Sequence, residues 1–466
     1  MEFLDLPLEL LSQILFHLPR VQHLASACRV NKTFYSFGIS RLYERASIYS
    51  WHKHAKVKVV CLFKTLADYP HLAKYVLKLE IRDFPKVFKA LRRGELEELV
   101  VSGLRNCVNL RSCTWTRDGA LNSAMLRVLQ ACDNLSELEI NGHSDGHYDA
   151  GILGAFAHLQ RVSVIMPSAD VVGQLPLWMA RTGPQLRSLT LICKTSPLVT
   201  DSVLEVLAPN LVHLEQFSIT GCLRVTHRGV WAILSYNVAG LRTLALEGLA
   251  PKFDLAALNA HCAGTAVLSR LCSFTLSVHN DTWLTSTAAL LTHAPLEIVQ
   301  LYAADPLAFT PTASADAFWH ALVSTHGARL TRVSVHRMAI SLHAIEDICV
   351  RCLTLRQLFV VVDPTALNAL TYCLSRARAL AAVHINFPTA AIEDRVEPVP
   401  VVLKAPDALA IVRRCPDTIT LFGCNARVWQ VEREVRRNDE GELVVERLLA
   451  KYESPDVPEQ FLVVRT

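Results

Sequence analysis

A six-residue pattern, apolar-x-x-apolar-x-apolar, recurs along most of the chain and limits its possible folds more than any other feature. From Leu110 to Leu380 ten steps cover 270 residues, an average of 27, and single steps run from 24 to 34 residues. A period of this length predicts a repeat array and not one central core. The twelve copies begin at Val76, Leu110, Leu135, Leu159, Leu186, Leu214, Leu241, Leu271, Leu296, Leu330, Leu355 and Leu380.

Each copy predicts one strand, because its last two apolar residues alternate and therefore point to the same side. The segments between copies have helical spacing, so each unit is expected to be one strand and one helix. Stacking of such units builds a continuous core, and we expect Leu189, Leu244 and Leu358 to be buried in it. This pattern is typical of leucine-rich repeats, and residues 214–230, which include Cys222, resemble their cysteine-containing subtype.

The first fifty residues follow a different pattern. Leu10, Ile14 and Leu15 have helical spacing, and this helix is expected to end at Leu18, because the next residue is a proline. A second short helix and a third, which follows Asn31, complete the segment. Three helices of this size cannot bury all of their apolar side chains among themselves. Part of this surface is therefore expected to dock on a partner or on the rest of the chain.

Several spaced positions in this segment resemble the F-box motif, from residue 3 to about residue 48. His23 departs from the motif, where many members carry an acidic residue. The resemblance implies a three-helix unit that binds a Skp-type adaptor, which in turn links to a cullin–RING ubiquitin ligase. It assigns adaptor binding to Leu6, Pro7, Leu8, Glu9, Ile14, Leu15, Leu18, Leu24, Val30 and Phe34.

These patterns together predict an α/β protein. An N-terminal three-helix F-box precedes a degenerate leucine-rich-repeat solenoid, with parallel strands on the concave face and helices on the convex face. A C-terminal β-hairpin is expected to cap the open end of the array, where a sheet edge would otherwise meet water. The expected segments are the F-box at 1–48, a helical connector at 49–75, the solenoid at 76–415, the strand and hairpin cap at 416–452, and a tail at 453–466.

Composition excludes several classes of protein. Apolar residues make up 51% of the chain and charged residues 19%, which argues against a disordered protein. The net charge of +4 is spread without a basic block, so no nucleic-acid partner is expected. The chain has fourteen cysteines, and those at core-like positions among apolar neighbours are expected to be reduced: Cys28, Cys132, Cys222, Cys272 and Cys373. With no secretory signal and no membrane-spanning run in the sequence, we expect a soluble protein of the cytoplasm, the nucleus or both.

Two groups of residues invite a chemical interpretation. His143 and His147 lie near Asp145 and Asp149, but the neighbouring glycines predict a solvated loop and not a metal site.

Cys349-x-x-Cys352 has no second cysteine pair at ligand spacing, so both residues are expected to be core cysteines. Nucleophile elbows and glycine-rich phosphate loops are missing from the sequence. We therefore expect no catalytic centre, no cofactor and no metal.

The two resemblances together imply a substrate receptor of an SCF-type cullin–RING ligase, which binds a protein substrate for ubiquitin-dependent degradation. Two alternatives stay open. The chain is a scaffold whose F-box recruits the adaptor without directing degradation, or a repeat protein whose helices merely cap the array. The sequence does not identify the substrate or its degron.

The substrate surface is predicted on the sheet face that carries the side chains between the apolar positions. Most of these side chains are small and polar, but they become larger toward the C-terminal end. Aromatic and Arg side chains are typical of binding hot spots. The alternatives are that β-favouring residues occur there for strand propensity alone, or that the hairpin covers them. The predicted substrate-binding residues are Ile298, Tyr302, Arg332, His336, Phe359 and His384.

Overall fold

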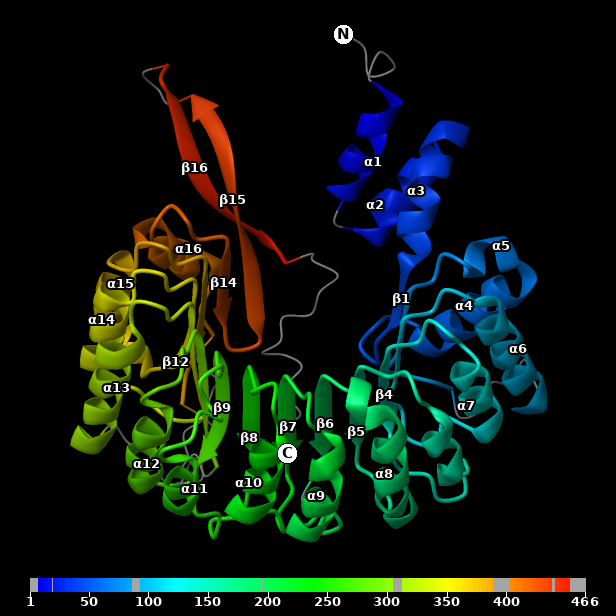
Figure 1. Cartoon of the computed structure of the whole chain (residues 1–466). Coiled ribbons are helices and arrows are strands. Elements are labelled where there is room, and N and C mark those ends of the chain that lie inside the picture. The colour runs from blue at the N-terminus through cyan, green and yellow to red at the C-terminus, as the bar shows by residue number, and fades with distance from the viewer. Residues whose placement is uncertain are drawn as a thin grey trace, which may run out of the picture. The chain divides into compact units, whose positions relative to one another are not determined.

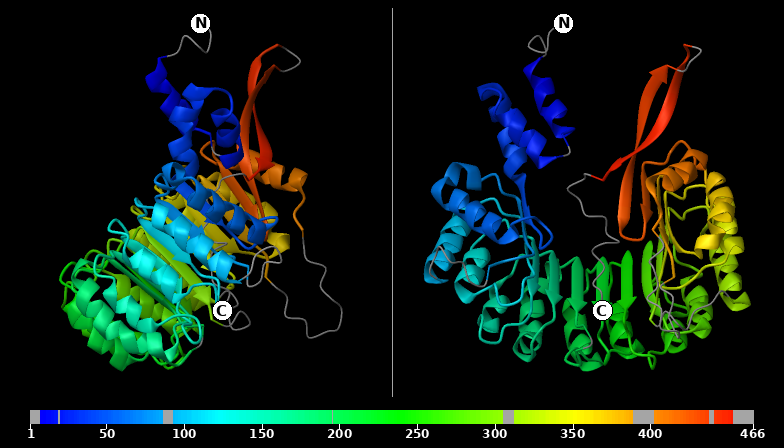
Figure 2. Two further views of the ribbon diagram at one scale, coloured as in Figure 1. Left: turned by 90° about the vertical axis from the view of Figure 1, so that its right-hand side faces the viewer. Right: turned by 180° about the vertical axis from the view of Figure 1, so that it is seen from behind.

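The computed structural model describes residues 7–18, 20–85, 93–194, 196–304, 312–388, 402–437 and 441–452. Two compact units are distinguished. The first runs from the N-terminal helices to Arg224 and includes Ser235–Ala239, and the second comprises Val225–Leu234 and Gly240–Tyr452. In each unit helices cover one face of a row of strands, as Figures 1 and 2 show.

Strands in the first unit follow one another in chain order and pair in parallel. A parallel neighbour requires a crossover, which the helices between strands provide. The strands are β1 (Arg45–Ile48), β2 (Lys78–Ile81), β3 (Ser112–Trp115), β4 (Glu137–Asn141), β5 (Arg161–Ile165), β6 (Ser188–Ile192) and β7 (Gln216–Thr220).

The second unit has the same parallel pairing up to β14 and antiparallel pairing after it. Strands β8 to β14 follow in chain order, and the pairs formed from β8 to β14 are parallel. β14 pairs antiparallel with β15, and β15 with β16. The strands are β8 (Thr243–Glu247), β9 (Ser273–Val278), β10 (Ile298–Ala303), β11 (Arg332–His336), β12 (Gln357–Val361), β13 (Ala382–Asn386), β14 (Leu421–Cys424), β15 (Arg427–Arg437) and β16 (Leu443–Lys451).

Helices occupy the segments between strands. Several begin after an Asn, Thr, Asp or Ser whose side chain accepts a hydrogen bond from a backbone N–H of the first turn, as at Asn122 and Thr200. The helices are α1 (Leu8–Phe16), α2 (Val21–Cys28), α3 (Lys32–Glu44), α4 (Ala55–Asp68), α5 (Pro70–Ala73), α6 (Arg93–Asn106), α7 (Ser123–Gln130), α8 (Ala169–Thr182), α9 (Asp201–Leu207), α10 (His227–Tyr236), α11 (Leu255–Cys262), α12 (Asp281–Leu291), α13 (Ala313–His326), α14 (Leu342–Arg351), α15 (Leu367–Ser375) and α16 (Ala405–Arg414). Short 3₁₀ turns lie at Ala150–Ala155, Gly183–Gln185, Ala208–Asn210 and Pro364–Ala366.

The apolar pattern of the sequence coincides with the strands. The last two apolar positions of its twelve copies lie on β2 to β13, one copy on each strand. Leu189, Leu244 and Leu358 are fully buried, as expected. The core of each unit therefore lies between its strands and its helices.

The row of strands extends beyond the twelve copies at both ends. β1 begins at Arg45, inside the segment expected to be helical, and pairs with β2. β14 carries a further copy of the pattern, formed by Ile419, Phe422 and Cys424, all three buried.

Strands β15 and β16 extend beyond α16 as a two-stranded ribbon (Figure 2). Midway along the ribbon, Arg447 donates hydrogen bonds of 2.7 Å to the carbonyl oxygens of Val412 and Cys415. These bonds hold the ribbon against the last turn of α16. Residues 438–440 of the predicted turn lie outside the described residues. Among the helices of the described ranges, none is both long and apolar enough to cross a bilayer.

Candidate functional site

Helices α1, α2 and α3 form a unit with a small interior of its own. Leu11 and Leu15, four residues apart on α1, are buried, and so are Leu24 and Cys28 on α2. Their close approach to α3 depends on Gly38, because a Cβ atom there would lie 2.6 Å from Cys28 Sγ. The helices are thus tightly packed without any contribution from a partner.

Other apolar side chains of the same helices face solvent. Their exposed fractions lie between 37% and 65%, which is high for a unit with so small a core. Phe16 and Tyr35 are among them. We refer to five others as the exposed apolar set: Leu8, Leu10 and Ile14 on α1, Val21 on α2, and Val30 between α2 and α3.

The residues predicted to bind an adaptor therefore fall into three groups. Leu6 lies outside the described residues; Pro7, Leu8, Glu9, Ile14 and Val30 are exposed; and Leu18 and Phe34 are half-buried. Leu15 and Leu24 differ from the expectation, because both are buried. They stabilise the helical unit from inside and present almost no surface to a partner.

A second surface lies on the helix-free face of strands β1 to β6 in the first unit. Arg45, Lys78, Ser112, Glu137 and Arg161 occupy one register on successive strands, so their side chains form a row. The hollow there has a volume of about 410 Å³, and we call it the charged pocket. Its charged residues are Arg45, Lys78, Glu80, Arg82, Glu137, Glu139 and Arg161.

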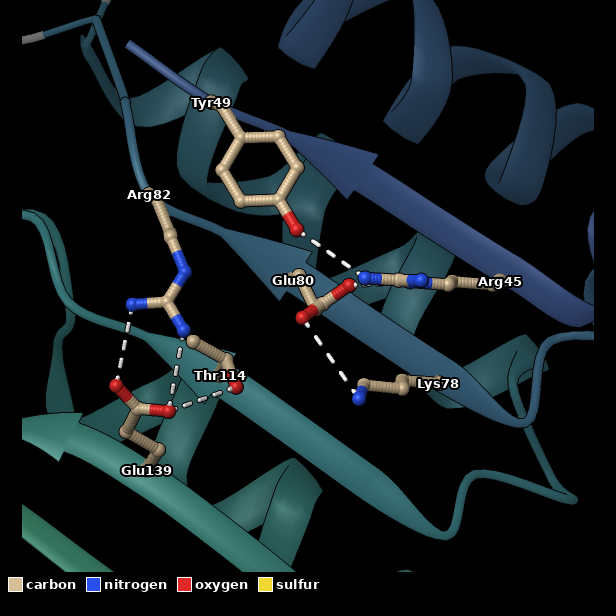
Figure 3. Close-up of polar contacts among 7 residues, drawn as sticks. All are labelled: Arg45, Tyr49, Lys78, Glu80, Arg82, Thr114 and Glu139. Carbon is tan, nitrogen blue, oxygen red and sulfur yellow. Dashed lines mark hydrogen bonds and ion pairs between the residues drawn. The ribbon is translucent and has the colours of Figure 1, made fainter. Parts of the chain in front are cut away.

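Ion pairs organise one end of the charged pocket, as Figure 3 shows. Glu80 is 5% exposed, and its carboxylate accepts from Arg45 Nε at 2.6 Å and lies 3.8 Å from Lys78 Nζ. Arg45 also donates to the Tyr49 hydroxyl at 3.2 Å. Burial raises the pKa of Tyr49, and the neighbouring Glu80 raises it further. The buried Glu80 carboxylate is thus paired with two cationic side chains, Arg45 and Lys78.

Further along the pocket the pairs are more exposed. Arg82 donates to both carboxylate oxygens of Glu139, at 3.1 and 3.3 Å, and the Thr114 hydroxyl donates to Glu139 at 3.4 Å (Figure 3). Arg161 Nε lies 3.4 Å from Glu137. Such a surface offers cationic hydrogen-bond donors and anionic acceptors to a polar peptide. Sequence reasoning missed these charged residues, although most of them, such as Lys78, Glu80 and Glu139, occupy polar positions of the repeated pattern.

Four of the predicted substrate-binding residues form a row on the same face in the second unit. The rings of Tyr302 and His336 stack 4.6 Å apart, those of His336 and Phe359 are 6.3 Å apart, and His384 follows at 6.0 Å. The Arg332 guanidinium lies 5.2 Å from the centre of the Phe359 ring. We call these four rings the aromatic row.

The aromatic row is less accessible than expected. Its four side chains are between 2% and 8% exposed, because each ring covers its neighbours on adjacent strands. Ile298 and Arg332 are half-buried. The expectation of exposed rings on this face is therefore wrong, and among the six predicted residues only Ile298 and Arg332 keep partial exposure.

Burial also changes the protonation of the row. It lowers the pKa of His336 to about 4, helped by the charges of His384 and Arg332. The pKa of His384 is lowered by burial as well, although its Nε2 lies 3.0 Å from the Asn425 carbonyl oxygen. Both imidazoles are therefore neutral near pH 7, which suits close stacking.

Cys349 and Cys352 are both buried, one on α14 and one just after it. Burial raises the pKa of the Cys352 thiol to about 12, and that of Cys349 further. A thiol in this state is a poor nucleophile.

Comparisons with known proteins identify the N-terminal segment. Residues 3–41 match the family model described as the F-box domain. A search of curated proteins gave no match to this chain.

Similar solved structures include that of the Rad7 and Elc1 complex in yeast, with 13% identity and a TM-score of 0.40 over 72% of this chain and 77% of that one. They also include the TLR13–ssRNA13 complex, with 11% identity and a TM-score of 0.36 over 67% of this chain and 46% of that one. Both scores lie below 0.5, and neither structure supports a conclusion about this protein. The chain carries an F-box domain at its N-terminal end.

Proposed function

We propose that this protein is the substrate-recognition subunit of an SCF-type ubiquitin ligase, whose F-box domain binds a Skp-type adaptor. The adaptor would connect it to a cullin–RING scaffold, and the strand–helix units, which we take to be leucine-rich repeats, would hold a protein substrate. The observation that carries the proposal is the F-box match over residues 3–41. This role would place the protein in the cytoplasm, the nucleus or both.

The exposed apolar set supports docking over a simple capping role. Helices that only cap an array direct their apolar side chains toward it. Here Leu8, Ile14, Val21 and Val30 face solvent, although the helical unit already has a buried interior. A partner that covers these side chains would remove apolar surface from water, at a gain of about 25 cal/mol for each Å².

The proposed mechanism is one of effective concentration. One body binds the adaptor through its helices and the substrate through its strand–helix units, so the conjugating enzyme meets a substrate lysine as a local partner. In this mechanism the chain contributes binding and orientation. Proton transfer and the covalent steps belong to other subunits.

The charged pocket is the better candidate for substrate contact. It is open to solvent and presents carboxylates and guanidinium groups, whereas the aromatic row is nearly covered. Neighbouring positive and negative side chains favour binding of a polar or mixed-charge segment of a substrate protein. Such complementary charges speed association most at low salt. On the second unit, the half-buried Arg332 and Ile298 form a separate candidate for substrate contact.

Affinity purification followed by mass spectrometry tests this function. The full chain should retain a Skp-type adaptor and a cullin, and the Leu8→Ala/Ile14→Ala variant should lose both. Val108→Ala is a matched control, because Val108 is an exposed apolar residue outside the helical unit. Equal recovery of the adaptor by wild type and the double variant would contradict the assignment.

A second variant separates a receptor from a scaffold. Lys78→Glu/Arg161→Glu reverses two charges of the pocket on β2 and β5. This variant should keep the adaptor but lose a set of proteins that accumulate, ubiquitinated, when the proteasome is inhibited. A chain that binds the adaptor but enriches no ubiquitinated protein is a scaffold.

A further inference from the structure

Two loops of the first unit bring metal-ligating side chains together at one edge of the sheet. Asp118 follows β3, and His143 and His147 follow β4, so all three lie near the carboxyl ends of adjacent parallel strands. We infer that Asp118, His143 and His147 form a binding site for a divalent transition-metal ion, with Zn²⁺ as the best match.

The distances within this cluster are close to those between the ligands of a bound transition-metal ion. One ligand atom from each of the three residues lies within 4.8 Å of the other two. His143 Nδ1 is 2.8 Å from Asp118 Oδ1, and the two imidazole rings are 5.5 Å apart. A tetrahedral Zn²⁺ with bonds of about 2.0–2.1 Å holds its ligand atoms roughly 3.4 Å apart. Side-chain rotations that open the His143–Asp118 pair slightly and bring the more distant ligand atoms together would give this spacing.

Hydrogen bonds hold the two loops that carry these residues. Asn141 Nδ2 donates to the Thr116 carbonyl oxygen at 3.2 Å and so joins the loops. The backbone N–H of His143 donates to Asn141 Oδ1 at 2.9 Å. Tyr148, just after His147, donates its hydroxyl to the Asn141 carbonyl oxygen at 3.0 Å. The ligand side chains are therefore mounted on fixed backbone, as metal sites require.

The backbone of Gly119 makes room for the His147 ring. Gly119 has a φ of +67°, and a Cβ atom there would lie 3.0 Å from His147 Cε1. The imidazole thus lies against the backbone of the loop that carries Asp118. This contact brings together residues that are far apart in sequence.

The ligand set selects the class of metal. Two imidazoles and one carboxylate suit Zn²⁺ and its neighbours in the first transition row, whereas Mg²⁺ and Ca²⁺ prefer oxygen ligands. Three protein ligands leave a fourth position for water or for a side chain of a bound partner. The sequence prediction of a solvated loop considered Asp145 and Asp149. Asp149 instead accepts from the Gly151 N–H at 2.8 Å at the start of a 3₁₀ turn.

Metal titration of the full chain, freed of metal with a chelator, tests the site. Calorimetry with Zn²⁺ should find a site that His147→Ala weakens by more than about 100-fold, the upper end for a lost outer-shell partner. His158→Ala is the matched control, because His158 is an exposed histidine of the same unit. Bound Co²⁺ should show the visible bands of a tetrahedral nitrogen and oxygen site.

Three measurements can contradict the inference. Equal Zn²⁺ affinity and stoichiometry in wild type, His147→Ala and His143→Gln would overturn it. Thiolate charge-transfer bands with Co²⁺ would assign the metal to cysteines and also overturn it. Zn²⁺ should raise the melting temperature of wild type but not of the variants. If His147→Ala does not fold without metal, His143→Gln and Asp118→Asn provide the same comparison.

Discussion

The charged pocket and the aromatic row occupy equivalent positions in two units and behave in opposite ways. Both lie on the helix-free face of parallel strands, at the positions between the buried residues. In the first unit these positions carry ion pairs such as Arg82–Glu139, which remain partly exposed. In the second they carry Tyr302, His336 and Phe359, which are nearly covered.

Cross-strand neighbours account for the difference. Strands lie about 4.7–4.9 Å apart, so register partners such as Tyr302 and His336 touch, and the diagonal neighbours His336 and Phe359 are still within reach of one another. Flat rings at that spacing stack and cover one another, whereas long charged side chains reach into water. The exposure of a strand residue therefore depends on its neighbours in the row more than on its own chemistry.

The largest expected effect is in the aromatic row. Phe359→Ala should lower the free energy of unfolding by about 3–5 kcal/mol, because it removes a buried ring from between two others. Tyr372→Ala, at an exposed ring on α15, is the control and should change little. Urea unfolding of both variants measures the difference. A loss below 1 kcal/mol for Phe359→Ala would mean that the row is open, as the sequence predicts.

Substitutions in the apolar cores of the two units should lower stability by similar amounts. Leu189→Ala on β6 and Leu358→Ala on β12 should each destabilise by about 2–5 kcal/mol, through lost burial and a cavity. Leu353→Ala, at an exposed leucine, is the matched control. Thermal unfolding checks all three. If either core variant melts like the control, its strand register is wrong.

Acid should destabilise the aromatic row. The pKa of His336 is about 4 when folded and near 6.5 when unfolded, so the unfolded chain binds the proton more readily in this range. Stability should fall as pH drops from 6.5 toward 4, by about 3 kcal/mol for this residue. His336→Phe should flatten the dependence in melts recorded across that range. An unchanged slope in the variant would show that His336 is not the titrating group.

The smallest effect is expected in the charged pocket. Arg82→Ala should cost about 1 kcal/mol or less, because the side chains of Arg82 and Glu139 are 24% and 28% exposed. The loss should shrink further in high salt. Urea unfolding at two salt concentrations measures it. A salt-independent loss of several kcal/mol would mean that the pair is as buried as the aromatic row.

The repeated pattern predicted the strands well, since β2 to β13 each carry one copy of it. Local spacing suffices there, because buried apolar residues must recur with the period of the unit. β1 was missed, because its weak pattern, with Ala46 and Ile48, follows directly on a helix. Leu15 and Leu24 resemble their exposed neighbours in sequence. Only the packing around Gly38 shows that these two leucines are buried.

Contacts between neighbouring strand–helix repeats could not be predicted from the sequence. The approach of Asp118 to His143 joins residues 25 positions apart and depends on loop geometry. The stacking of Tyr302 on His336 likewise depends on the register between β10 and β11. In both cases the residue types were visible, but their neighbours were not.

The adaptor affinity of the full chain tests the central claim most directly. Wild type should bind a purified Skp-type adaptor, and Leu8→Ala/Ile14→Ala should bind it about 30-fold more weakly, a loss of about 2 kcal/mol typical of interface anchors. Val108→Ala should bind like wild type. Circular dichroism should show that the double variant keeps its fold, because both substituted side chains are exposed. Equal affinity in all three proteins, or no binding by wild type, would contradict the account.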